Sequence, residues 1–182
     1  MIVRKTEIEG LLEIEPSVFR DERGYFLESF RNDVLRAAGI TADFVQDNES
    51  MSQKGVLRGL HFQAPPYGQG KLVRVVRGAV LDVAVDIRTG SPTYGRHVSV
   101  VLTGDNKKQF WVPPGFAHGF LVLEDDTVFS YKCTGYYNRE SEGAIKWDDP
   151  SLGIEWNISD PVLSEKDKIA PLLSHIVSPF HI

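Results

Sequence analysis

The chain has 182 residues, 42% hydrophobic and 10% aromatic, with a net charge of −5. This length allows one sizeable core but hardly two, so we expect a single domain over residues 1–182. The acidic balance argues against a nucleic-acid partner. We find no signal peptide and no apolar run near the roughly 20 residues of a membrane span. The single cysteine, Cys133, excludes an internal disulfide framework. These features predict a cytoplasmic protein without membrane association.

Short strands between two short helices are predicted along the chain. One or two helical turns should run from Asn32 to Ala38, ended by Gly39, and a second helix should follow Ser164. Between them, apolar runs bounded by turn residues predict strands at Val56–Gln63, Lys71–Arg77, 81–88, 98–103, Phe110–Val112, Gly119–Glu124 and 128–133.

The apolar runs have a dominant period of two. In 81–88 every second side chain is leucine, valine or isoleucine, and in 128–133 Tyr131 shares one face with Phe129 and Cys133. Alternation of this kind predicts half-buried antiparallel strands. Strands this short and regularly spaced indicate an all-β barrel or double-sheet jelly roll with a few short helices.

Polar residues interrupt this apolar pattern in Arg58–Gln63, Gly70-Lys71 and Pro113–His118. The last has the form Pro-x-Gly-x-x-His and resembles the second conserved motif of the cupin superfamily. Metal-binding cupins also carry His-x-His and a glutamate in their first motif. Here His61 stands alone, and no glutamate follows it before Gly70. Since a catalytic transition-metal site usually needs three protein ligands, we predict no metal site.

Eight further segments are spread along the chain: FRDERGYF (19–26), ESF (28–30), QDN (46–48), GVLRGLHFQ (55–63), GKLVR (70–74), PPGFAHGF (113–120), YKCT (131–134) and SEKD (164–167). In their order and spacing these segments, from Phe19 to about Pro171, resemble the dTDP-4-dehydrorhamnose 3,5-epimerase family. The resemblance implies a cupin-type jelly roll without a cofactor. It also implies a homodimer in which residues near the amino terminus complete the neighbouring subunit's site.

The resemblance further implies residue roles. His61 would be the catalytic base, Asp167 its carboxylate partner, Tyr131 the general acid and Lys71 a stabiliser of the enolate. The substrate would be a dTDP-hexulose, epimerised at ring carbons three and five on the route to dTDP-L-rhamnose and cell-envelope polysaccharide. The residues that the resemblance implies to bind this substrate are Arg23, Glu28, Gln46, Asn48, Arg58, His118 and Glu142. We add Lys166 to this set, and we expect aromatic residues such as Phe19, Phe26 and Tyr136 to stack on the nucleobase.

The residue types suit this chemistry. A carbon beside a ketone is weakly acidic, so its deprotonation needs a base tuned near neutral pH and a positive charge at the developing enolate oxygen. His61 and Lys71 can meet these needs, and we expect Lys71 to lie one strand away from His61. Inversion also needs a proton source on the opposite face of the sugar, for which a phenol inside the barrel is suited. Without a Gly-x-Gly-x-x-Gly or Walker-type loop, arginines such as Arg23 and Arg58 would have to bind the diphosphate, and no nicotinamide is expected.

Structural roles remain open for each catalytic candidate. His61 could be a hydrogen-bonded core histidine, Tyr131 a wall aromatic and Lys71 a solvated strand-edge residue. Ser164-x-x-Asp167 also resembles a capping box, in which the carboxylate needs no catalytic role.

Two further polar features have structural interpretations. His118 could hold the Pro-Pro-Gly turn rather than contact substrate. Asp82 and Asp86 lie four residues apart, and we interpret them as a polar strand face or a dimer contact rather than a glycosidase pair.

Three alternative functions remain open. A sister enzyme could invert one centre or move the keto group in another deoxysugar pathway, since the same base and acid serve all these reactions. A non-catalytic cupin could bind a sugar nucleotide as a sensor, and a metal-dependent cupin oxygenase or isomerase is the third alternative.

Overall fold

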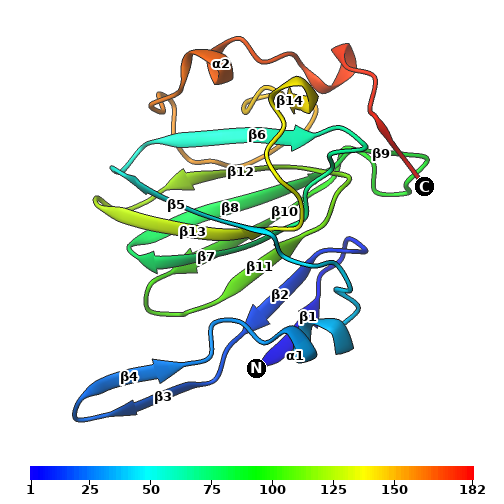
Figure 1. The fold of residues 1–182 in the computed structure, drawn as a ribbon. Coiled ribbons are helices and arrows are strands. Elements are labelled where there is room, and N and C mark those ends of the chain that lie inside the picture. The colour runs from blue at the N-terminus through cyan, green and yellow to red at the C-terminus, as the bar shows by residue number, and fades with distance from the viewer.

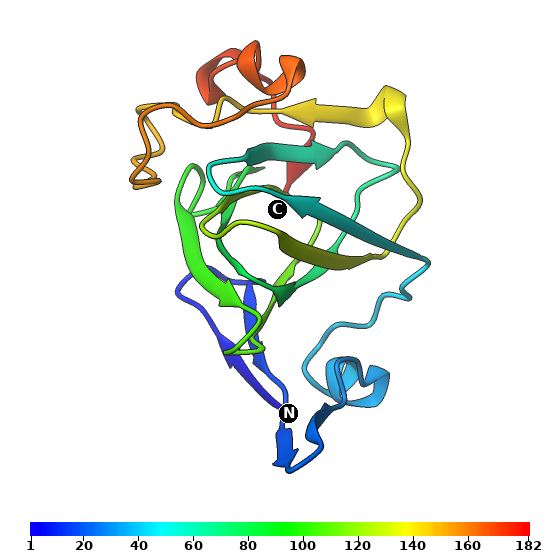
Figure 2. The same cartoon turned by 90° about the vertical axis from the view of Figure 1, so that its left-hand side faces the viewer.

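Two antiparallel sheets face each other in the computed structural model, which describes residues 1–182 (Figures 1 and 2). The six-stranded sheet has the order β1 (Ile2–Lys5), β2 (Leu12–Glu15), β11 (Gln109–Val112), β7 (Lys71–Arg77), β13 (Thr127–Cys133), β5 (Gln46–Ser52). The five-stranded sheet has the order β10 (His97–Thr103), β8 (Ala79–Asp86), β12 (Phe116–Val122), β6 (Leu57–Gln63), β14 (Glu142–Ala144). The predicted all-β double sheet is confirmed.

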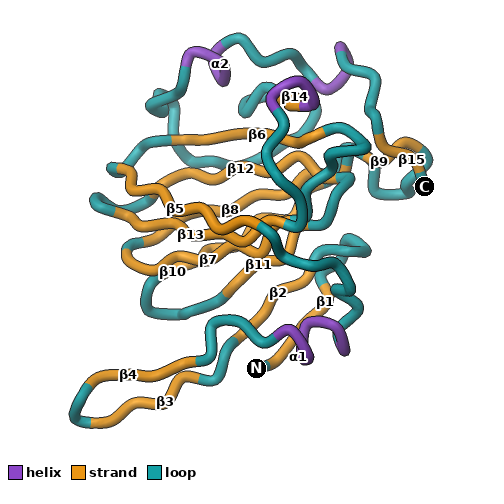
Figure 3. Tube along the Cα trace, in the orientation of Figure 1, coloured by secondary structure: helices purple, strands orange, loops and turns teal.

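The remaining elements lie outside these sheets. A hairpin of β3 (Val18–Asp21) and β4 (Gly24–Leu27) projects away from the barrel, at the lower left of Figure 1. We call this hairpin the arm. Near the carboxyl terminus, β9 (Arg88–Thr89) pairs in parallel with β15 (Phe180–His181). Helix is confined to four short segments (Figure 3): α1 (Asn32–Ala37), η1 (Arg139–Ser141), α2 (Glu165–Lys168) and η2 (Leu173–His175). None is long and apolar enough to cross a membrane.

The predicted central elements are confirmed, whereas several peripheral strands were not predicted. All seven predicted strands are present with small changes at their ends, and Gly39 follows α1 with φ +95°. The strands β1 to β5, β9, β14 and β15 were missed. The arm strands are exposed on both faces, so their sequences carry no alternation of apolar and polar residues.

The expectation of half-buried strands is wrong for the centre of the five-stranded sheet. In β8, seven of eight residues are buried. Its inner face contributes Val80 and Ala84 to the core between the sheets. Its outer face contributes Val83 and Val85 to a second core, which the segment after β14 covers with residues such as Trp156. The last fifth of the chain, residues 145–182, therefore covers this face and excludes solvent from it.

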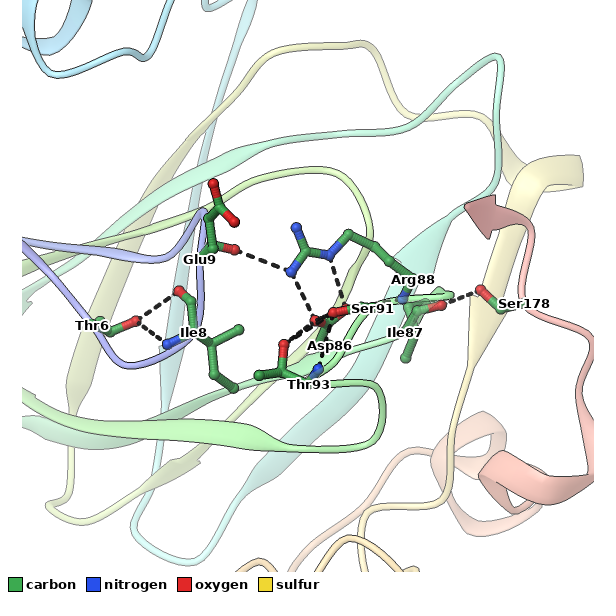
Figure 4. Close-up of polar contacts among 9 residues, drawn as sticks. All are labelled: Thr6, Ile8, Glu9, Asp86, Ile87, Arg88, Ser91, Thr93 and Ser178. Atoms are coloured by element: carbon green, nitrogen blue, oxygen red, sulfur yellow. Dashed lines mark hydrogen bonds and ion pairs between the residues drawn. The ribbon is translucent and has the colours of Figure 1, made fainter. Parts of the chain in front are cut away.

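Asp86 is buried, as is Asp82, so the two aspartates interpreted as a polar strand face or a dimer contact are both enclosed within their own chain. The Asp86 carboxylate is 0% exposed and accepts hydrogen bonds from the backbone and guanidinium of Arg88 and from the hydroxyls of Ser91 and Thr93 (Figure 4). Arg88 also donates to the Glu9 carbonyl, which ties the β1–β2 turn to this cluster. Burial acts to raise the pKa of Asp86, but these donors outweigh it and lower the pKa to about 2.

Candidate active site

A cavity of about 520 Å³ opens between the two sheets, with walls from both. Phe120 and Phe129 stack at 4.0 Å between ring centroids and form part of its apolar wall. Val162 and Leu163, from the segment before α2, line it as well. Its polar lining contains eight of the residues predicted from the sequence: Arg58, His61, Lys71, His118, Tyr131, Glu142, Lys166 and Asp167.

A β-bulge in β6 places both Arg58 and His61 on the cavity wall although they are three residues apart. The register between β6 and β12 shifts at Gly59, which has φ +136°. A Cβ atom at Gly59 would lie 2.5 Å from the Gly119 Cα, so only glycine allows the two strands to approach this closely. The extra residue re-aims the strand, as bulges beside functional sites do.

His61 and Asp167 form a close pair at the cavity. The distance from His61 Nε2 to Asp167 Oδ1 is 2.5 Å, and the Asp167 side chain is 2% exposed. Burial acts to raise the pKa of Asp167, but the hydrogen bond and charge of His61 outweigh it, so its pKa lies below the usual range. An ionised Asp167 accepts the Nε2 proton, which leaves Nδ1 of His61 able to accept another.

Asp167 takes part in both arrangements considered from the sequence, the cap of the last helix and the pair with His61. The Ser164 hydroxyl caps α2 by accepting the backbone N–H of Asp167 at 3.2 Å. The side chain of Asp167, in contrast, is directed to His61. A cap and a histidine partner are therefore compatible in one short helix.

Lys71 and Tyr131 line the opposite wall of the cavity. They come from neighbouring strands β7 and β13 of the six-stranded sheet, whereas His61 lies in the five-stranded sheet. The expectation that Lys71 lies one strand from His61 is therefore wrong, because the barrel brings them together across its interior. Burial raises the pKa of the Tyr131 phenol and lowers the pKa of the Lys71 ammonium.

His118 belongs to β12, which lies between β6 and β8 in the five-stranded sheet, and it is 6% exposed. Its Nε2 is 2.9 and 3.0 Å from the two carboxylate oxygens of Asp82, which is 0% exposed. Sequence reasoning did not connect these residues. The only signal was the position of Asp82 among the apolar residues of its strand face.

The other predicted binding residues that reach the cavity lie at its rim. Lys166 Nζ lies 2.6 Å from Glu142, which also accepts a hydrogen bond from the Tyr137 hydroxyl. Gln46 donates to Asn48 at 3.0 Å, and both line an adjoining hollow that shares Arg58, His61, Lys71, Tyr131 and Glu142 with the cavity.

Four predicted binding residues lie elsewhere. Phe19 and Phe26 of the arm are 62% and 66% exposed, and the Arg23 side chain is 85% exposed and pairs with Asp21. Glu28, just after the arm, pairs with Arg31. None of the four lines the cavity of its own chain.

The donors in the cavity do not form a metal-ligand set. No group of three or more histidine, cysteine, aspartate or glutamate side chains is placed to hold a metal ion. What the cavity brings together is a histidine with a buried carboxylate partner, a lysine and a phenol. This set can transfer protons to and from a substrate placed between the sheets.

Comparison with known proteins gives a consistent result. The family model described as dTDP-4-dehydrorhamnose 3,5-epimerase matches residues 5–175. The chain is 56% identical over 168 residues to the dTDP-4-dehydrorhamnose 3,5-epimerase of Shigella flexneri, covering 92% of this chain and 93% of that one.

Solved structures share the fold over nearly the whole chain. The dTDP-6-deoxy-D-glucose-3,5-epimerase of Legionella pneumophila, in complex with dTDP-4-keto-L-rhamnose, has a TM-score of 0.93 at 54% identity, covering 97% of this chain and 94% of that one. A 4-keto-6-deoxy sugar epimerase from the novobiocin biosynthetic gene cluster of Streptomyces spheroides has a TM-score of 0.92 at 39% identity, with coverages of 96% and 88%.

Proposed function

The chain belongs to the dTDP-4-dehydrorhamnose 3,5-epimerase family, and we propose that it converts dTDP-4-dehydro-6-deoxy-D-glucose into dTDP-4-dehydro-L-rhamnose. As an epimerase it is an isomerase, and its product would supply dTDP-L-rhamnose biosynthesis. The observation that carries the proposal is the His61–Asp167 pair, 2.5 Å apart, on a cavity that also presents Lys71 and Tyr131.

His61 removes a proton from the carbon beside the ketone. Asp167 holds the ring through Nε2 and stabilises the imidazolium that forms, as carboxylates do in other histidine pairs. Lys71 offers its ammonium to the ketone oxygen, where enolate charge develops. The substrate is neither oxidised nor reduced overall, so this route needs no redox cofactor.

Tyr131 donates its own phenolic proton to the enolate carbon from the other side, and the His61 imidazolium and the Tyr131 phenolate then return to their starting states by proton exchange with solvent. His61 and Tyr131 belong to different sheets and reach the cavity from opposite walls. Inversion requires removal and return of a proton on opposite faces of the sugar ring, and this arrangement supplies one group for each face. Because burial raises the pKa of the phenol, Tyr131 keeps its proton until the enolate forms.

The nucleotide-sugar is held by residues at the rim. Arg58 and Lys166 carry the positive charges for the diphosphate, while Gln46, Asn48 and Glu142 offer hydrogen-bonding groups. His118 contacts the sugar from the cavity wall. We place this step in the cytoplasm, which suits a chain whose single cysteine is buried and unpaired.

The arm serves the site of a second copy in a homodimer. Its aromatic residues Phe19 and Phe26 are largely exposed, and Arg23 has no ligand-facing role in its own chain. A projecting hairpin with an arginine and two exposed rings suits a diphosphate and a nucleobase held across a subunit interface. This arrangement would account for the four predicted binding residues that lie away from the cavity.

Inversion of a single centre is the second candidate. It is favoured by the similarity to a 3'-monoepimerase from Streptomyces bikiniensis, whose solved structure has a TM-score of 0.88 at 38% identity and covers 93% of this chain and 86% of that one. Base and acid would be the same in both cases, so the shape of the cavity decides which carbons react.

Proton NMR of the substrate in deuterated water distinguishes these candidates. We expect deuterium at carbons three and five, with both centres inverted. Inversion of only one centre would favour the second candidate, and no exchange at either carbon would contradict both candidates.

The Tyr131→Phe variant should still exchange protons at these carbons, with configuration largely retained, because it keeps the base and the lysine but loses the acid. Near-normal inversion by this variant would remove Tyr131 from the mechanism.

A further inference from the structure

Residues 134–138 form an irregular segment between β13 and η1, which we call the tyrosine loop (Figure 1). Its backbone makes one hydrogen bond to another backbone group, from the Thr134 N–H to the Gly70 carbonyl at 3.0 Å. It carries Tyr136 and Tyr137, which are 70% and 54% exposed. A loop with so few backbone hydrogen bonds and such exposed side chains would rearrange freely unless other groups held it.

Gln63, at the end of β6, holds the centre of this loop. It is 7% exposed, and its carbonyl oxygen accepts the N–H of Asn138 at 2.7 Å. Its amide donates to the carbonyls of Tyr136 and Tyr67, at 3.3 and 2.8 Å. Both amide hydrogens and the carbonyl oxygen are therefore taken by backbone groups of neighbouring loops.

Two further glutamines hold the neighbouring residues of the tyrosine loop. Gln46 of β5 accepts the N–H of Tyr137 at 3.1 Å, and Gln69, just before β7, donates to the Gly135 carbonyl at 2.6 Å. Each of the consecutive residues 135–138 is thus hydrogen-bonded through its backbone to a glutamine side chain. A loop held from outside in this way is ordered before a ligand arrives, so binding does not have to order it.

The tyrosine loop borders the space next to the reacting groups. Tyr137 lines the adjoining hollow of about 510 Å³, and its hydroxyl donates to Glu142, which lines both the hollow and the cavity. A sugar placed between His61 and Tyr131 fills the cavity, so the rest of the substrate has to extend beyond it. Exposed tyrosine rings beside this hollow suit stacking on a nucleobase.

We propose that Gln63 and Gln69 are positioning residues for the nucleotide, which act through the backbone of the tyrosine loop to hold Tyr136 and Tyr137 in place. The inference rests on the proposed function, because its ligand is the dTDP portion of that substrate. Neither glutamine transfers a proton, so their loss should weaken ground-state and transition-state binding alike. The expected signature is a raised KM, and a raised Kd for dTDP, with kcat nearly unchanged.

The experiment measures dTDP binding by calorimetry and turnover by steady-state kinetics. Gln63→Leu should raise the Kd for dTDP about tenfold, as when a loop spends about a tenth of its time in the binding conformation. Gln69→Leu removes one hydrogen bond rather than three and should raise it about threefold. In both variants kcat should stay within about twofold of wild type. The control is Gln53→Leu, because the exposed Gln53 also uses both ends of its carboxamide, on Asp126, but lies outside the cavity and the hollow.

A double-mutant cycle separates action through the loop from direct contact with the nucleotide. Tyr136→Ala/Tyr137→Ala removes both rings that the loop presents, and the fold should tolerate this because both side chains are largely exposed. In this background Gln63→Leu should raise the Kd by less than about twofold, since no ring is left to position. Equal effects in the two backgrounds would show that Gln63 does not act through the rings, and would overturn the inference.

Wild-type affinity for dTDP in a folded Gln63→Leu variant would also overturn the inference, as would a fall in kcat at unchanged KM. If Gln63→Leu does not fold, Gln69→Leu in the same two backgrounds decides, because Gln69 is less buried and its effect should likewise vanish without the rings. Wild-type protein that binds dTDP without epimerising the substrate would overturn the proposed function alone. The two failures are therefore distinguishable.

Discussion

Two buried carboxylates in this chain have contrasting partners. Asp86 is 0% exposed and is held by Arg88, Ser91 and Thr93. Asp167 is 2% exposed and is paired with His61, whose side chain is 32% exposed and lines the cavity. Arginine stays protonated throughout the working pH range, whereas histidine gains and loses its proton near neutrality. A permanently charged, saturated cluster is suited to stability, and a titratable partner facing a cavity is suited to proton transfer.

The largest effect on turnover should come from replacing His61, the titratable partner of Asp167. We expect His61→Asn to lower kcat by roughly 10²–10⁴-fold, the usual contribution of a general base. The free energy of unfolding should change little, since asparagine can still hydrogen-bond to Asp167. Turnover of the purified variant measures the first quantity and denaturant unfolding the second. His97→Asn, outside every motif, is the control, and retention of more than about a tenth of wild-type turnover by His61→Asn would exclude His61 as the base.

A third pair, Asp21–Arg23, extends the comparison because its arginine is permanently charged, as in the Asp86 cluster, but its side chain is exposed to solvent. Exposed ion pairs contribute little to stability, so Arg23 is available for a ligand. We expect Arg23→Ala to raise KM about 10- to 100-fold with little change in kcat, as for loss of a charged hydrogen bond in ground and transition state alike. Calorimetry should show weaker binding of dTDP. The control is Arg36→Ala, which removes an exposed pair with Asp43 outside the arm. Unchanged affinity for dTDP would assign Arg23 to structure.

The saturated cluster should show the opposite behaviour to His61. The pKa of Asp86 is lowered from 3.8 to about 2, so its charged form stabilises the fold by about 2 kcal/mol above pH 4. This contribution is lost as pH falls from about 4 to about 2. Asp86→Asn should lower Tm by roughly 4–8 °C at neutral pH and keep wild-type kcat at 20 °C. The difference in Tm between this variant and wild type should shrink in acid. A difference independent of pH would show that the charge of Asp86 does not stabilise the fold.

The smallest effect should come from chelation. Because His61 lacks the second histidine of metal-binding cupins, we expect dialysis against a strong chelator to leave turnover unchanged. Elemental analysis of the dialysed protein provides the control. Loss of activity that one divalent ion restores would contradict the assignment of proton transfer to side chains alone.

The sequence by itself determined the all-β class, the central strands and the residue types of the site. Alternation with a period of two is a local property, and it predicted β8, β10 and β13 from their own residues alone. The motifs also identified His61, Lys71, Tyr131 and Asp167, which the structure brings to one cavity although they span more than a hundred residues.

Only the tertiary structure decided which of these residues face one another. Lys71 lies across the barrel from His61 because consecutive strands enter different sheets, and no local pattern records that choice. Asp82 reaches His118 through a diagonal contact between β8 and β12. The arm residues, by contrast, lie outside the cavity of their own chain, because the arm is an exposed hairpin that does not pack against the core. Long-range packing, which sums many weak contacts between distant segments, determines these relationships.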